Sequence, residues 1–131
     1  MHIEHIALYC NDLEKMKDFY CKYFEGTANE IYRSKNTKGF ESYFVSFASG
    51  ARFELMKKSG ISDVSTVTAR AENPGFVHLA FSAGSREKVD TLTNVLRADG
   101  FVVLGEPRVT GDGFYESVIA DPEGNRIEIT E

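Results

Sequence analysis

The sequence has few cysteines, no excess of positive charge and no long apolar run, and each of these absences excludes a class of protein. Cys10 and Cys21 are the two cysteines of the 131 residues, too few for a disulfide framework and too far apart for a CxxC pair. We interpret them as free thiols in a cytoplasmic protein. The net charge of −5, without a basic block, argues against nucleic acid as a partner.

No apolar segment approaches the length that spans a membrane, so we expect no membrane partner. The N-terminus enters a strand-like pattern directly, without the charged and then apolar leader of a secretory signal. Hydrophobic residues make up 42% of the chain, which is typical of a globular protein with a substantial core. By length, the chain forms one domain, or two small modules that share a core.

The first half of the chain predicts a strand, a helix and then three strands. Asn11 or Asp12 caps the helix, whose apolar stripe ends before Gly26, and Gly26 is the expected C-terminal cap. Two of the strands are joined at Ser49-Gly50, a hairpin signal. The expected strands are residues 2–10, 27–33, 41–48 and 51–56.

After residues 57–75, which have no clear period and are the best candidate for a linker, the same pattern begins again. Ser85 caps a second helix with the stripe Val89, Leu92 and Leu96, and Gly100 closes it. A loop is expected at 106–113. The sequence DPEGN at 121–125 predicts a tight turn, which Pro122 and Gly124 favour. The expected strands are residues 76–83, 101–105, 114–120 and 126–130.

The two halves repeat one another in spacing as well as in pattern. His5 lies 49 residues before Glu54, and His78 lies 50 residues before Glu128. Each half has its histidine in the first strand and its glutamate in the last. We therefore predict an α+β fold in a single domain, residues 1–131. Two βαβββ modules, residues 1–56 and 76–131, would be related by a pseudo-two-fold axis and curve around a shared cleft.

The four repeated residues indicate a metal site. A lone histidine in a strand is usually structural, and a glutamate on a polar strand face is usually just solvated; the paired spacing is what favours a function. His5, Glu54, His78 and Glu128 suit a divalent ion such as zinc, nickel, cobalt, manganese or iron. Such an ion polarises a carbonyl and stabilises an enediolate, which suits an isomerase or lyase.

Nearly the whole chain resembles the vicinal oxygen chelate superfamily, which includes glyoxalase I, the bleomycin-resistance proteins and the extradiol dioxygenases. The DPEGNRIEI ending is the most specific piece of this resemblance. The matching stretches are IEHIALYCNDLEKMKDFY, ARFELM, GFVHLAFS and GDGFYESVIADPEGNRIEI. The fold of this family is the paired βαβββ module that the pattern predicts.

Within the superfamily, the order His, Glu, His, Glu is similar to glyoxalase I. This resemblance implies a metal-dependent lyase that acts on a small carbonyl substrate through a metal-bound enediolate. It also implies that Glu128 is both ligand and catalytic base, and that Glu54 is its catalytic partner across the metal. On family grounds we expect a homodimer. The sequence leaves open whether the modules pair within one chain or swap between two.

Two positions depart from glyoxalase I enzymes that use glutathione. Those commonly carry an arginine where this chain has Tyr9, and an asparagine where it has Lys57-Lys58-Ser59; both departures argue against glutathione. Candidates for lining the substrate cleft, each equally open to an ordinary packing or surface role, are Tyr9, Arg52, Met56, Phe114 and Tyr115.

Two other functions fit the sequence. A metal-free binding protein of the bleomycin-resistance kind would sequester a ligand, although such binders generally lack the full ligand set. An iron-dependent dioxygenase would need two histidines and one glutamate, so Glu54 would be surplus. Arg33, Lys35 and Lys38 flank a polar loop and would either meet an anionic substrate or form a solvated basic loop.

Overall fold

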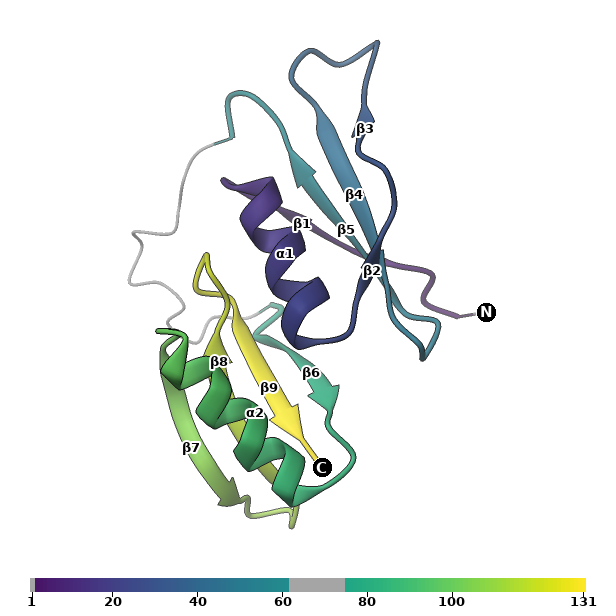
Figure 1. Cartoon of the computed structure of the whole chain (residues 1–131). Helices are drawn as coiled ribbons and strands as arrows, with labels where there is room; N and C mark the ends of the chain where they lie inside the picture. The colour runs from purple at the N-terminus through teal and green to yellow at the C-terminus, as the bar shows by residue number, and fades with distance from the viewer. Residues whose placement is uncertain (1, 62–74) are drawn as a thin grey trace. The chain divides into compact units, whose positions relative to one another are not determined.

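The computed structural model describes residues 2–61 and 75–131, which form an α+β structure (Figure 1). The chain divides into two compact units, Met1–Val64 and Ser65–Glu131. Each contains one helix and one mixed sheet over its described residues, which confirms the predicted fold class. Most of the predicted linker, 57–75, lies outside the described residues. Among the helices described, none is long and apolar enough to cross a membrane.

In the first unit, the sheet has the order β1-β5-β4-β2, and β3 also pairs with β4. β1 and β5 are parallel, and the other pairs are antiparallel. Its elements are β1 (Ile6–Tyr9), α1 (Leu13–Tyr23), β2 (Thr27–Ala28), β3 (Tyr32–Arg33), β4 (Glu41–Ser46) and β5 (Arg52–Lys57).

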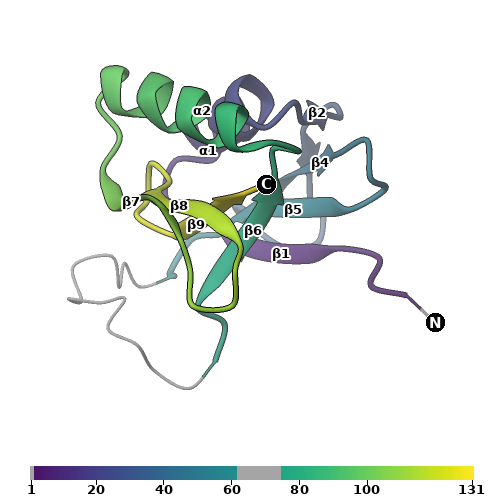
Figure 2. The same ribbon diagram turned by 90° about the horizontal axis from the view of Figure 1, so that it is seen from below.

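In the second unit, the sheet has the corresponding order β6-β9-β8-β7, again with a parallel first pair. Helix α2 lies along one face of this sheet (Figure 2). The two units thus share one topology, as the repeat predicts. The elements are β6 (His78–Ser82), α2 (Arg86–Ala98), β7 (Val103–Val109), β8 (Tyr115–Ala120) and β9 (Arg126–Thr130).

Both helices begin at predicted caps. The Asp12 side chain accepts a hydrogen bond from the Lys15 backbone N–H at 3.0 Å, and Ser85 accepts one from Lys88 at 3.3 Å. These bonds satisfy backbone donors that the first turn of a helix leaves unpaired. Each helix is thereby fixed to start directly after the first strand of its unit.

The ends of the two helices differ. Gly100 closes α2 as predicted, with φ +89° and the Phe101 N–H donating to Leu96 O at 3.0 Å. The prediction for Gly26 is wrong, because Glu25 takes the left-handed conformation, with φ +57°. Gly26 serves packing instead: a Cβ there would lie 2.5 Å from Val45 Cγ1 and 3.0 Å from the Tyr20 carbonyl oxygen.

Two strand predictions need correction. The strand expected at 27–33 is broken into β2 and β3, because the Asn29 side chain accepts a hydrogen bond from the Phe44 N–H at 2.7 Å. The first half of the loop expected at 106–113 is strand, since β7 continues to Val109. Register shifts around Gly105 interrupt the alternation of β7, so the pattern ended the predicted strand at residue 105.

The predicted apolar faces form the cores. Phe53 and Leu55 are buried in the first unit, and Ile127 and Ile129 are fully buried in the second. The α2 stripe differs from the prediction: Thr93 rather than Leu92 is fully buried. Hydrogen bonds satisfy the Thr93 hydroxyl, 2.7 Å from Ser117 Oγ of β8 and 2.6 Å from the Val89 carbonyl oxygen.

The turn before β9 is built around a buried carboxylate. Asp121 accepts hydrogen bonds from the backbone N–H groups of Glu123, at 2.9 Å, and Asn125, at 2.8 Å. It also accepts one from the Asn125 side chain at 2.6 Å. Gly124 has φ +78°, as the turn prediction requires. This turn fixes where β9 starts, and therefore the position of Glu128 along the strand.

The contacts of Gly26 predict a specific stability loss. We expect Gly26→Ala to lower the free energy of unfolding by about 1–3 kcal/mol, because the added methyl group overpacks against Val45 and the Tyr20 carbonyl. Gly111→Ala is the matched control: a Cβ there meets nothing within 4 Å. Chemical denaturation of both variants checks this, and equal losses would contradict it.

Candidate functional site

In the first unit, the parallel pairing of β1 with β5 brings His5 and Glu54 together. Ala7 is the register partner of Glu54, so His5 lies two residues before the position opposite the glutamate. Its Nε2 is 3.7 Å from Glu54 Oε2. Glu54 projects from the face of β5 opposite buried Phe53 and Leu55, with 20% of its side chain exposed.

The second unit repeats this arrangement. Ala80 of β6 is the register partner of Glu128, so His78 again lies two residues before the position opposite the glutamate. His78 Nε2 is 3.5 Å from Glu128 Oε2, and the Glu128 side chain is 18% exposed. The nearly equal sequence spacing therefore reflects an equal register in the two parallel strand pairs.

A second carboxylate lies behind His5. Glu4 bonds to His5 Nδ1 through one oxygen and to Arg52 through the other. The bond at Nδ1 leaves Nε2 as the nitrogen that faces Glu54. Phe44 of β4 also contacts this group: its ring is 5.4 Å from the His5 ring, edge to face, and 4.5 Å from the Arg52 guanidinium.

In the second unit, the additional carboxylate lies beside Glu128 instead. Burial raises the pKa of the Glu128 carboxyl above its usual value, and the negative charge of Glu116 raises it further. His78 and Arg108 act in the opposite direction. Arg108 of β7 holds Glu116 of β8 at 3.3 Å. Three charged residues thus lie in neighbouring strands, in the order Arg108, Glu116, Glu128.

Comparison with known proteins identifies the family of the chain. The family model for the glyoxalase/bleomycin resistance protein/dioxygenase superfamily matches residues 2–129. The chain belongs to this superfamily. The resemblance stated from the sequence is thereby confirmed.

Relatives agree with this assignment. The "Uncharacterized protein YqjT" of Bacillus subtilis (strain 168) is 29% identical over 130 residues, covering 97% of this chain and 96% of the relative. A structure described as a possible glyoxalase from Bacillus cereus has a TM-score of 0.71 at 25% identity, with 100% and 99% of the chains covered.

Glyoxalase I from Zea mays has a TM-score of 0.77 at 19% identity. The match covers 98% of this superfamily member but 43% of the maize chain. A glyoxalase/bleomycin resistance protein/dioxygenase domain from Frankia sp. EAN1pec has a TM-score of 0.80 at 17% identity, covering 99% and 96% of the two chains. Both likenesses show a shared fold.

The donors in this superfamily member fit a divalent metal ion chemically. Each unit supplies one imidazole nitrogen and one carboxylate oxygen, the donor types that zinc and related ions take. The Glu4–His5 bond resembles the carboxylate that commonly supports a metal-binding histidine. Within residues 2–61 and 75–131, no three histidine, cysteine, aspartate or glutamate residues are placed together to hold a metal. Each pair is thus half of the predicted four-residue set.

The residues predicted to line the substrate site fall into different positions. Arg52 and Met56 share the face of β5 that carries Glu54, and Tyr9 is the register partner of Met56, with 49% of it exposed. Phe114 precedes β8 and is 55% exposed.

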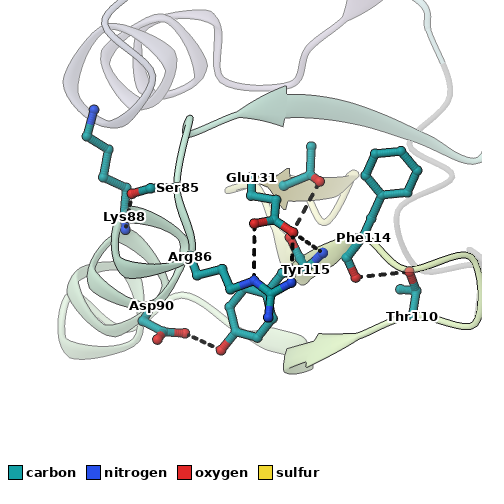
Figure 3. Close-up of polar contacts among 9 residues, drawn as sticks. Ser85, Arg86, Lys88, Asp90, Thr110, Phe114, Tyr115 and Glu131 are labelled. Atoms are coloured by element: carbon teal, nitrogen blue, oxygen red, sulfur yellow. Dashed lines mark hydrogen bonds and ion pairs between the residues drawn. The ribbon is translucent and has the colours of Figure 1, made fainter.

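Tyr115 instead joins a polar cluster with α2 (Figure 3). Its hydroxyl donates to Asp90 at 2.7 Å, and Arg86 lies 5.2 Å from its ring. Arg86 also bonds both Glu131 carboxylate oxygens, at 3.1 and 3.2 Å. Tyr115 alternates with Glu116, so it occupies the helix-covered face of the sheet and not the face of Glu128. This cluster ties α2 to the end of β9.

Sequence reasoning did not single out Glu4, Phe44, Arg108 or Glu116. A strand period places Glu4 on the face opposite His5, whereas residues 2–5 precede β1 and do not follow its alternation. Glu116 was detectable: it alternates with Ser117 and Ile119, which are buried, and so had to share the face of Glu128. Arg108 was hidden because its strand was taken for a loop.

The effect of Glu116 on Glu128 can be tested directly. We expect Glu116→Gln to lower the pKa of Glu128, because it removes a neighbouring negative charge. The pKa should stay above its usual value, since burial is the larger cause. Carboxyl ¹³C NMR titration of metal-free protein measures the shift.

Arg108→Gln is the control, and it should shift the pKa of Glu128 in the opposite direction. Arg108 lowers the pKa of Glu128, so its removal should move the titration midpoint of Glu128 to higher pH. Shifts in the same direction for Arg108→Gln and Glu116→Gln would contradict the assignment.

Proposed function

We propose that this protein is a metal-dependent lyase or isomerase of the glyoxalase I type that acts on a small carbonyl substrate. His5, Glu54, His78 and Glu128 would bind one divalent ion of the zinc, nickel, cobalt, manganese or iron type. The repeated register supports this proposal. In both units the histidine lies two residues before the register partner of the glutamate, and its Nε2 lies within 3.7 Å of the glutamate Oε2.

A bound divalent ion would polarise the carbonyl of the substrate and stabilise the negative charge that develops on its oxygen. Glu128 would act as the base. In a substrate with a hydroxyl on the carbon next to the carbonyl, such as a hemithioacetal, its ionised carboxylate would take the proton from that carbon and deliver it to the former carbonyl carbon. The hydroxyl proton would pass to the former carbonyl oxygen, so that the reaction is an isomerisation without a net change in protons. A raised pKa suits this role, because a base works best when its pKa approaches the working pH.

The residues around the pairs have supporting roles in this proposal. Glu4, held by Arg52, fixes the ring orientation of His5 and leaves the Nε2 lone pair available to bind a metal ion. Phe44 covers one edge of the same ring and limits its movement. Glu54 would be the catalytic partner of Glu128. Tyr9, where glutathione-dependent relatives commonly have arginine, favours a substrate other than a glutathione adduct.

Metal content is the first measurement that tests the proposal. We expect about one divalent ion per chain in the wild-type protein, and metal binding weakened by more than about tenfold in Glu128→Gln and in His5→Ala. His2→Ala is the matched control: it removes an exposed histidine outside the set and should leave metal content unchanged. Elemental analysis after dialysis against zinc, nickel or cobalt measures this.

Activity then separates the proposed functions. A hemithioacetal isomerisation assay with glutathione and with other thiols should show turnover that Glu128→Gln abolishes. Metal binding without any such turnover would contradict the lyase proposal. A protein that takes up no metal from any of these solutions would instead favour the second candidate, a ligand-sequestering protein of the bleomycin-resistance kind.

The second candidate has one observation in its favour. Within each described unit the donors come as two residues, and two donors alone hold a metal weakly. We also propose a homodimer, as in many members of the superfamily. Light scattering of the purified protein measures its mass, and a monomer would contradict this part of the proposal.

A further inference from the structure

The first unit contains a pocket away from the His5–Glu54 pair. It holds about 470 Å³, a volume within the range of roughly 300–1,000 Å³ that is usual for small-molecule sites. Residues of β3, β4 and β5 and of the segments next to them surround it. The lining residues are Arg33, Ser34, Gly39, Phe40, Glu41, Lys57, Lys58 and Ser59.

The strand register places this pocket on the opposite side of the first unit's sheet from the His5–Glu54 pair. Arg33 is the partner of Glu41, and Glu41 is the partner of Lys57, so these three side chains form a row across three strands. Lys57 shares its face with buried Leu55, whereas Glu54 faces the other way. The pocket is therefore distinct from the site of the proposed function.

The charge of the pocket is positive in a chain whose net charge is −5. Arg33, Lys57 and Lys58 contribute three cations, and Glu41 contributes one carboxylate. Arg33 Nε bonds Glu41 Oε1 at 2.8 Å. Neither Lys57 nor Lys58 forms an ion pair with a residue that the structure describes. Two cations thus line the pocket outside any ion pair with the described part of the protein, and the Glu41 carboxylate is engaged by Arg33.

Hydroxyl and backbone groups complete the walls. Ser34 Oγ accepts hydrogen bonds from the N–H groups of Asn36, at 3.2 Å, and Thr37, at 3.0 Å, and this shapes the loop that follows β3. Gly39 has φ +71°, and a Cβ there would collide with the Ser59 hydroxyl. The loop and the segment after β5 therefore pack closely beside the cations.

We propose that this pocket is a binding site for a small anion that carries a phosphate or carboxylate group. Lys57 and Lys58 supply the unpaired positive charge, and the hydroxyls of Ser34 and Ser59 supply donors. Glu41 competes with the anion for Arg33, so it limits affinity. Arg33, Lys57 and Lys58 would thus have a function beyond a solvated surface, whereas Lys35 and Lys38 do not line the pocket.

Titration of protein that has been stripped of metal with EDTA and then dialysed free of EDTA tests this proposal. Its outcome does not depend on the metal site, and no chelator carboxylate competes with the probes. The probes are inorganic phosphate and citrate, followed by amide NMR at constant ionic strength. We expect saturable shifts at Arg33, Ser34 and residues 57–59. Tighter binding of phosphate identifies a phosphorylated ligand, and tighter binding of citrate identifies a polycarboxylate; each supports the site.

Variants that remove a positive charge and a variant that removes a negative charge should change anion affinity in opposite directions, which makes the test specific. Lys57→Gln and Lys58→Gln should each weaken anion binding about two- to fivefold, and Glu41→Gln should tighten it by a similar factor. Lys35→Gln and Lys38→Gln are the matched controls: they lie in the same loop region, remove the same charge and do not line the pocket.

Three results would overturn the proposal. The first is the absence of saturable binding of either probe. The second is equal weakening by Lys35→Gln and Lys57→Gln, which would mean that overall charge alone attracts the anion. The third is unchanged or weaker binding in Glu41→Gln, since the freed Arg33 should then favour the anion.

Discussion

The candidate site depends on one structural constraint, the parallel pairing of the first and last strands in each unit. A parallel pair cannot be closed by a tight turn, so the chain must cross over between the two strands. In each unit the chain between them forms the helix, which covers one face of the sheet, and the antiparallel strands. The opposite face is left for polar residues, and there the histidine of one strand meets the glutamate of the other.

The two units use this shared frame differently. In each, an arginine binds an additional carboxylate that touches one member of the His–Glu pair. In the first unit that carboxylate, Glu4, holds the histidine, and its effect is orientation. In the second, Glu116 lies beside the glutamate, and its effect is on proton affinity. This asymmetry bears on the proposed role of Glu128 as the base, because burial and the neighbouring Glu116 carboxylate together raise the pKa of Glu128.

The sequence was sufficient for the features that depend on period and capping. Alternation placed Glu54 and Glu128 opposite the apolar residues, and Asp12 and Ser85 marked the helix starts. It was not sufficient where the cause is tertiary. Gly26 is a glycine because of Val45, a residue distant in sequence, and not because of a helix cap. The second half of β7, from residue 106 on, was taken for a loop because its register shifts break the alternation on which strand prediction rests.

Alternation along β5 also separates two kinds of chemistry by a few residues of one strand. Glu54 lies on the polar face near His5, and Lys57, three residues later, lies on the other face beside Glu41. Two residues of a strand whose numbers differ by an odd amount lie on opposite faces of the sheet. Lys57 therefore projects away from Glu54, so that the sheet of the first unit separates the positive pocket from the His5–Glu54 pair.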